Sequence, residues 1–169
     1  LHGRDRRQRQ MCIRDSKSER PLIIGGHGVW WSGAEKALET AGLQLRLPIF
    51  NVPYHQKLLG EECEAYMGLA DFHQYHPSKD AIQEADLVLM IGGRLDNQMN
   101  FGNPPFFPET TTLVCINGSH EELDYNRAAD AVLLSDPGAF LAAILEVDKT
   151  WDGWFDLQRQ RRGAWVDHW

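Results

Sequence analysis

The sequence of 169 residues lacks long apolar runs and contains only three cysteines. A membrane-spanning helix needs about 20 consecutive apolar residues, and no stretch approaches that length, so we expect no membrane span. Cys12, Cys63 and Cys115 form neither a Cys-x-x-Cys pair nor a zinc pattern. Their odd number, without the apolar region of a secretory signal, favours a reducing compartment and predicts a cytoplasmic location.

The sequence also lacks the motifs of self-contained catalytic sites. It has no Gly-x-Ser-x-Gly elbow, no phosphate-binding P-loop and no His-Glu-x-x-His pair. His73 and His76 lack the i, i+4 spacing of a helical metal pair and have no clear third ligand, which favours structural or surface roles. We therefore predict neither a catalytic residue nor a metal site in this chain.

Positive charge is scarce except at the start of the chain. Residues 1–20 carry a net charge of +4, and the remaining 149 residues carry −11. A nucleic-acid arm and a targeting peptide are both open as explanations, but the segment lacks interleaved aromatics and contains three acids. The hexapeptide 11–16 resembles translated adapter sequence from metagenomic reads. We favour that interpretation, treat residues 1–19 as a head foreign to the domain, and expect no nucleic-acid partner.

What the sequence does contain is the composition and pattern of an α/β domain. It is 43% hydrophobic, enough for a sizeable core. Short apolar runs alternate with helical stretches, which predicts βαβ units. We expect a three-layer sandwich with about six mostly parallel strands, similar to the Rossmann-like FAD/NAD-binding type. The predicted strands are 21–24, 45–52, 86–91, 111–116 and 131–134, and the predicted helices begin near 32, 77, 119, 137 and 150.

Two parts of this prediction depend on local signals. Ser32 and Glu35 have the spacing of a capping box, and Gly42 can end the helix that follows. Residues 53–76 mix aromatics, His and Gly without clean periodicity, so we expect a loop-rich crossover with one short helix.

Ligands of an open parallel sheet bind outside the carboxyl ends of its strands. Glycines mark three predicted strand ends, at 25–28, 92–93 and 117–118. Glycine there allows close backbone approach to a phosphate, but it also simply makes a tight turn. The first turn is not the dinucleotide fingerprint, because Trp31 stands where its third glycine belongs.

Two side chains at these ends could contact a ligand. Arg94 follows Gly92-Gly93 and can reach a diphosphate bidentately; the alternative is an ion pair with Asp96 or another nearby acid. His27 lies inside the first glycine turn and either contacts a ligand or is merely exposed.

The ordered motifs resemble a known family. Residues 20–29, 32–34 and 85–96 are similar to the central domain of thiamine diphosphate-dependent enzymes, nearest to the acetolactate synthase and 2-hydroxyacyl-CoA lyase group. The resemblance covers residues 20–147, and residues 148–169 would begin a linker helix. It implies flanking thiamine-binding domains in the same chain, a homo-oligomer, and thiamine diphosphate with Mg²⁺ bound outside this segment. The segment would be an inactive fragment of a lyase or transferase.

The resemblance also implies a nucleotide site. The central domain holds FAD in acetolactate synthase-like members and ADP or nothing in other relatives. The family's glycine loop falls on Gly26, His27 and Gly28, with His27 replacing a glycine, and its flavin-contacting arginine falls on Arg94. Two acids near the ribose and adenine fall on Asn117 and Ser119, which lack their charge. The candidate cofactor-binding residues are Gly26, His27, Gly28, Gly93, Arg94 and Asn117. A degenerate structural domain and a stand-alone adenine-nucleotide-binding module remain as alternatives.

Overall fold

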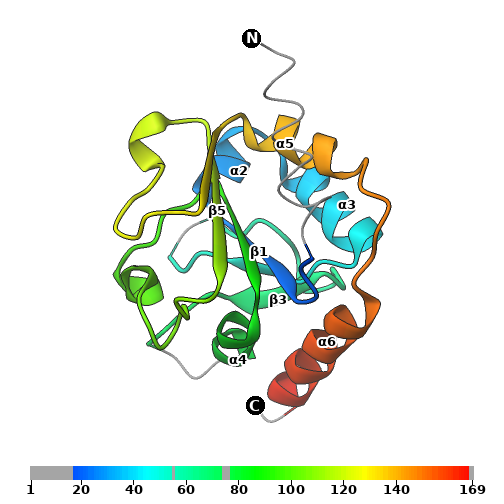
Figure 1. Ribbon diagram of the computed structural model, residues 1–169. Coiled ribbons are helices and arrows are strands. Elements are labelled where there is room, and N and C mark those ends of the chain that lie inside the picture. Colours follow the sequence, from blue (N-terminus) through cyan, green and yellow to red (C-terminus); the bar gives the residue numbers. More distant parts are fainter. Residues whose placement is uncertain (1–16, 55, 74–76, 168–169) are drawn as a thin grey trace.

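A computed structural model describes residues 17–54, 56–73 and 77–167, and Figure 1 shows its course. The described residues form one six-stranded sheet in the order β3-β2-β1-β4-β5-β6, and every neighbouring pair is parallel. The strand order reverses between β1 and β4, which creates the crevice where such sheets bind ligands. The strands are β1 (Pro21–Gly25), β2 (Ile49–Asn51), β3 (Tyr66–Leu69), β4 (Leu87–Ile91), β5 (Thr112–Asn117) and β6 (Ala131–Leu134).

Helices cover both faces of this sheet. One group consists of α2 (His27–Trp31), α3 (Glu35–Leu45) and α5 (Pro137–Ile144), which contact one another. The other consists of α4 (Pro77–Glu84) and α6 (Asp152–Val166), which pack together on the other side, as Figure 1 shows. Two 3-10 turns, η1 (Asn97–Gly102) and η2 (His120–Glu122), follow β4 and β5. The predicted three-layer α/β class with six strands is confirmed.

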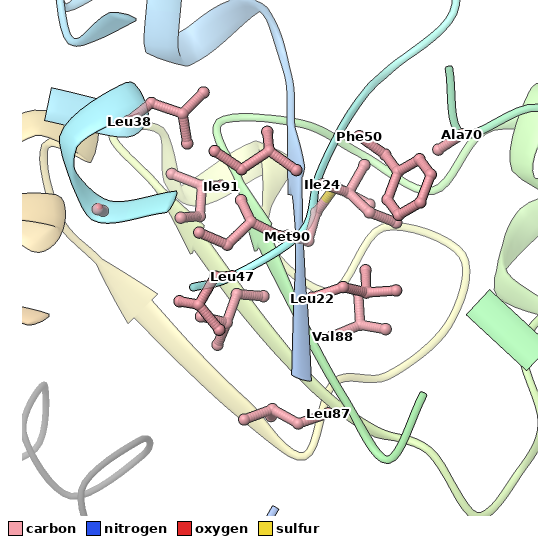
Figure 2. Close-up of a cluster of buried hydrophobic side chains, with 14 of the residues drawn as sticks. Leu22, Ile24, Leu38, Leu47, Phe50, Ala70, Leu87, Val88, Met90 and Ile91 are labelled. Carbon is pink, nitrogen blue, oxygen red and sulfur yellow. The ribbon is translucent and has the colours of Figure 1, made fainter. Parts of the chain in front are cut away.

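The core lies around the two central strands. Every residue of β1 and β4 is buried, as expected for parallel strands covered on both faces. Their register pairs Leu22 with Val88 and Ile24 with Met90. Figure 2 shows these side chains gathered with neighbours from α3 and β2, including Leu38 and Phe50. This packing fixes the positions of the carboxyl ends of β1 and β4.

The predicted capping box is wrong. Ser32 Oγ donates to the carbonyl of Val29 at 3.1 Å, so it closes the turn of α2 instead of starting α3. Helix α3 begins after Ala34 without a side-chain cap. Gly42 does not end the helix; it lies inside it, where a Cβ would meet Ile49 Cδ1 at 2.4 Å. The glycine therefore serves the close approach of α3 to β2.

Three element boundaries also differ from the predictions. Residues 53–76 contain the strand β3, which the mixed composition hid. The predicted helix over 119–126 is only the short turn η2, because Asp124 and Asn126 adopt left-handed φ values of 55° and 69°. The strand predicted over 45–52 is confined to Ile49–Asn51. Cys12 and His76, and with them residues 1–16 of the predicted head, lie outside the described residues.

The residues just before β1 are hydrogen-bonded to the carboxylate of Asp86. Ser18 Oγ donates to one carboxylate oxygen at 2.5 Å, and the backbone amides of Glu19 and Arg20 donate at 2.8 and 3.0 Å. Burial alone would raise the pKa of the Asp86 carboxyl, but these three hydrogen bonds outweigh burial and hold the pKa below its usual value. Asp86 thus ties the start of β1 to the start of β4.

Asp86→Asn is expected to reduce the free energy of unfolding by about 1–2 kcal/mol at neutral pH, because the carboxylate loses charge-assisted hydrogen bonds. Because the pKa of Asp86 is lower in the folded than in the unfolded chain, its carboxylate stabilises the fold at any pH above the unfolded-state pKa of about 3.9. This contribution is lost as the pH falls through the pKa of the folded chain. The difference in unfolding free energy between the unmodified chain and Asp86→Asn should therefore shrink as the pH falls below the unfolded-state value. Urea unfolding at neutral pH and in acid below the unfolded-state pKa measures this difference under both conditions. Asp148→Asn, at an exposed position, is the control, and an equal gap at both pH values would contradict the assignment.

Helix α6 is part of this packed unit. Trp151, Trp154 and Phe155 are buried, and the two indole N–H groups donate to the carbonyls of Ser18 at 2.9 Å and Pro21 at 2.8 Å. The described part of the predicted linker helix, α6 with residues 148–151 before it, therefore lies against the domain. The predicted domain boundaries at 19 and 147 stay predictions. Among the described residues, no helix combines the length and apolarity required to cross a bilayer.

Candidate functional site at the β1–β4 crevice

A pocket of about 250 Å³ lies at the carboxyl ends of β1, β4 and β5. It brings together five of the six predicted site residues: His27, Gly28, Gly93, Arg94 and Asn117. The sixth, Gly26, lies behind the pocket against Gly93. Trp31, Gly92 and Glu122 complete the lining, and the sequence had not marked Glu122 as a site residue.

The glycines of the two strand ends pack backbone to backbone. A Cβ on Gly26 would lie 2.4 Å from Gly93 Cα, and one on Gly28 would lie 2.8 Å from Gly92 Cα. Gly92 itself has a φ of +64°, which favours glycine. The glycines are therefore required by the contact between the turns that follow β1 and β4.

Two amides of the first turn are hydrogen-bonded within the protein. Gly26 N–H donates to Ile91 at 2.9 Å, and Gly28 N–H donates to Gly92 at 2.8 Å. These donors point across to the other turn, so they cannot serve a phosphate without breaking that contact. A phosphate in the pocket therefore cannot use these two amides while the turns stay packed together.

An aromatic cluster borders one side of the pocket. The His27 ring stacks on Trp31 with a centroid distance of 5.6 Å and an angle of 17°. Trp30 meets both rings edge-on, at 5.2 Å from His27 and 4.8 Å from Trp31. Trp31 is 75% exposed, so its ring offers a flat face beside the pocket. Such a face is suited to stacking with a planar base.

Arg94 also lines the pocket and already has partners within the protein. Its Nε lies 2.9 Å from Glu122 Oε2, and its guanidinium lies 5.3 Å from the centre of the Tyr125 ring. The acid predicted as one alternative, Asp96, instead accepts from the Gln98 amide at 3.0 Å and caps η1. Arg94 therefore forms an ion pair, but its partner is Glu122, 28 residues later in the sequence, and not Asp96.

Asn117 closes the third side of the pocket at the end of β5. Its Oδ1 accepts from the backbone amide of Ser119 at 3.2 Å, which starts the turn carrying Glu122. The oxygen that could accept from a ribose is thus engaged within the protein. The place of Glu122 in the pocket depends on the tight turn His120–Glu122, which stands where the sequence predicted a helix.

The described residues contain no group of three or more His, Cys, Asp or Glu side chains placed to hold a metal ion. His73 Nε2 lies 3.0 Å from the carbonyl of Asn97, consistent with a structural contact.

Cys63 and Cys115 are buried and form no disulfide, and burial raises the pKa of the Cys115 thiol to about 12. The Asp152 carboxylate accepts a hydrogen bond from Thr150 Oγ1 at 2.6 Å and forms an ion pair with Arg46 Nε at 3.1 Å. Asp152 therefore belongs to a surface ion-pair network.

Comparisons with known proteins agree with the fold. The 2-hydroxyacyl-CoA lyase 1 of Mus musculus is 30% identical over 139 residues, covering 82% of this chain and 22% of that protein. The acetolactate synthase large subunit of Lactococcus lactis is 25% identical over 145 residues, covering 86% of this chain and 25% of that protein. A thiamine diphosphate-dependent 4-hydroxybenzoylformate decarboxylase from Rhodococcus jostii superposes with a TM-score of 0.72 at 14% identity, covering 89% of this chain and 29% of that structure.

The chain thus spans about a quarter of the length of the curated relatives it matches. A family model described as the central domain of thiamine pyrophosphate enzymes matches residues 15–144, which is most of the chain. The strand order and the ordered motifs of the two central strands agree with that match. The chain belongs to the central-domain family of thiamine pyrophosphate enzymes.

Proposed function

We propose that this chain is the non-catalytic central domain of a thiamine diphosphate- and Mg²⁺-dependent carboligase or decarboxylase, and that it also binds an adenine nucleotide. Its work is to set the spacing of flanking thiamine-binding domains and to support contacts in a homo-oligomer. The family match and the share of its relatives' length that the chain spans support this role.

The described residues do not offer a site that fits the metal ion of thiamine diphosphate. They contain no cluster of metal-ligating side chains. Asp152, at the exposed start of α6, is already in an ion pair with Arg46. No catalytic step is therefore assigned to this chain. The chemistry of the parent enzyme belongs to the domains on either side.

The domain assignment is tested by the gene that encodes the segment. We expect one thiamine-binding domain encoded upstream and another downstream, in the same reading frame. An intact reading frame that encodes this domain alone would contradict the central-domain proposal and would favour a stand-alone nucleotide-binding module.

The single observation that supports nucleotide binding is the pocket at the crevice between β1 and β4, whose lining includes both an exposed aromatic ring and a cation. Trp31 can stack on an adenine, and Arg94 can approach a phosphate. A volume of about 250 Å³ is just below the roughly 300–1,000 Å³ of typical ligand pockets.

Trp31→Ala is expected to weaken ADP binding by about tenfold, because stacking on one base contributes roughly 1–3 kcal/mol. Calorimetric titration of the full chain with ADP, and separately with FAD, provides the measurement. Tyr54→Ala is the matched control, since Tyr54 is 80% exposed but does not line the pocket. If the unmodified chain gives no heat with either nucleotide, the nucleotide proposal is wrong, whereas the central-domain role is unaffected.

A further inference from the structure

The pocket contains its own competitor for an anionic ligand. Among the described residues that line it, Arg94 is the permanently charged cation and Glu122 is the acid. The two form an ion pair at 2.9 Å between Nε and Oε2. A phosphate that binds Arg94 must share the guanidinium with this carboxylate or displace it.

The carboxylate is held in place by the turn after β5. Ser119 N–H donates to the Asn117 side chain at 3.2 Å, and Glu122 N–H donates to the Ser119 carbonyl at 3.3 Å. The left-handed residue Asp124 then accepts from the amide of Ala129 at 2.8 Å and closes the loop. Glu122 is therefore positioned by backbone geometry, beyond its attraction to Arg94.

Two backbone amides of the glycine turn, those of Gly26 and Gly28, do not offset this negative charge. The amides of Gly26 and Gly28 donate to carbonyls of the neighbouring turn, at 2.9 and 2.8 Å. Among the side chains that line the pocket, Arg94 is then the permanent positive charge that a diphosphate can use, and Glu122 is paired with it. A neutral nucleoside, in contrast, needs only the aromatic face and the polar lining.

We infer that Glu122 is a specificity-determining residue, which competes with the ligand's phosphates for Arg94 and reduces the pocket's preference for ADP over adenosine. This inference rests on the proposed nucleotide site. The Arg94–Glu122 pair is partly exposed, with side chains 44% and 31% accessible, so it is held weakly enough to be exchanged. The Arg94–Glu122 ion pair therefore lowers the affinity for phosphate groups but does not block the pocket.

The test compares adenosine, ADP and inorganic pyrophosphate by calorimetric titration of the full chain and of Glu122→Gln. The variant should bind ADP and pyrophosphate roughly tenfold more tightly, because it removes both a competitor and a repulsive charge. Its affinity for adenosine should not change. The double variant Arg94→Gln/Glu122→Gln should lose the whole gain, since the gain acts through the guanidinium.

Glu39→Gln provides the matched control. Glu39 pairs with Lys36 at 2.6 Å and is 30% exposed, close to the exposure of Glu122, but it lies on α3 outside the pocket. It removes the same charge, so a general electrostatic effect would appear in both variants. Circular dichroism of each variant checks the fold, and Glu122→Asp, which withdraws the carboxylate by one methylene, replaces Glu122→Gln if that variant unfolds.

The outcomes separate this inference from the proposed function. Equal ADP affinity in the unmodified chain and in Glu122→Gln, with both binding ADP, overturns the competition and leaves the nucleotide site standing. Weaker adenosine binding by Glu122→Gln overturns it too, because Glu122 would then be accepting from the ribose. No binding of any of the three ligands by either protein overturns the nucleotide site itself.

Discussion

Phe155→Ala is expected to lower the free energy of unfolding by about 3–5 kcal/mol, the usual cost of truncating a fully buried phenylalanine. The ring has no exposed surface, and the Arg46 guanidinium lies 4.0 Å from its centre. Arg46 in turn pairs with Asp152 at 3.1 Å and Asp156 at 2.6 Å, so the ring supports a network that joins α3 to α6. Chemical denaturation of the full chain measures the loss.

Leu157→Ala serves as the control for this prediction. Leu157 lies on the same helix but is 37% exposed, so its truncation leaves no comparable cavity, and the expected loss is small. If both variants lost the same small amount, α6 would not belong to the cooperative unit, and residues 148–169 would behave as the linker predicted from the sequence. A large loss for Phe155→Ala alone places α6 within the folded domain.

The central strands could be predicted because they combine two independent signals. Residues 87–91 form an apolar run that ends at paired glycines, and residues 21–24 repeat that pattern. Strands buried on both faces have this composition, and their order along the chain implies parallel pairing. The structure confirms both strands, and it also shows that they pair directly with each other. Local sequence was sufficient here because burial on both sides leaves little freedom in composition.

The outer elements were less predictable because their conformation depends on neighbours distant in sequence. Strand β3 spans only Tyr66–Leu69 and contains a glycine, so it has little signal of its own and forms by pairing with β2. The helix expected over 119–126 is interrupted at Asp124, whose side chain accepts from Ala129 and favours a left-handed turn. Such competition between side-chain and helical hydrogen bonds is not visible in hydrophobic periodicity.

The site was predictable in its position but not in its electrostatics. Strand ends marked by glycine indicated the pocket, and His27, Gly93 and Arg94 do meet there. The partner of Arg94 could not be read from spacing, because Glu122 reaches the pocket only through the turn after β5. Whether the predicted residues contact a nucleotide stays a prediction that the titrations above address.

Gly26→Ala is expected to lower the free energy of unfolding by about 3 kcal/mol, the upper end of the usual cost of overpacking. The backbone at Gly26 is extended, with φ −117° and ψ −173°, so alanine adopts it without strain. The cost arises from the new Cβ, which would lie 2.4 Å from Gly93 Cα and 2.6 Å from the Gly92 carbonyl oxygen. Backbone atoms cannot rotate away as a side chain can, so the ends of β1 and β4 must separate and weaken the hydrogen bond from Gly26 N–H to Ile91.

Gly153→Ala shows whether this loss is specific to the contact between the turns. A Cβ at Gly153 meets no atom within 4 Å, and the residue lies in the first turn of α6, where alanine gains up to about 1 kcal/mol in helix propensity. The same chemical change is therefore expected to have opposite signs at the two positions. Thermal and urea unfolding of the two variants compare them directly. A Gly26→Ala protein as stable as the unmodified chain would mean that the two turns are loosely packed, and the amides of Gly26 and Gly28 would then be available to a phosphate after all.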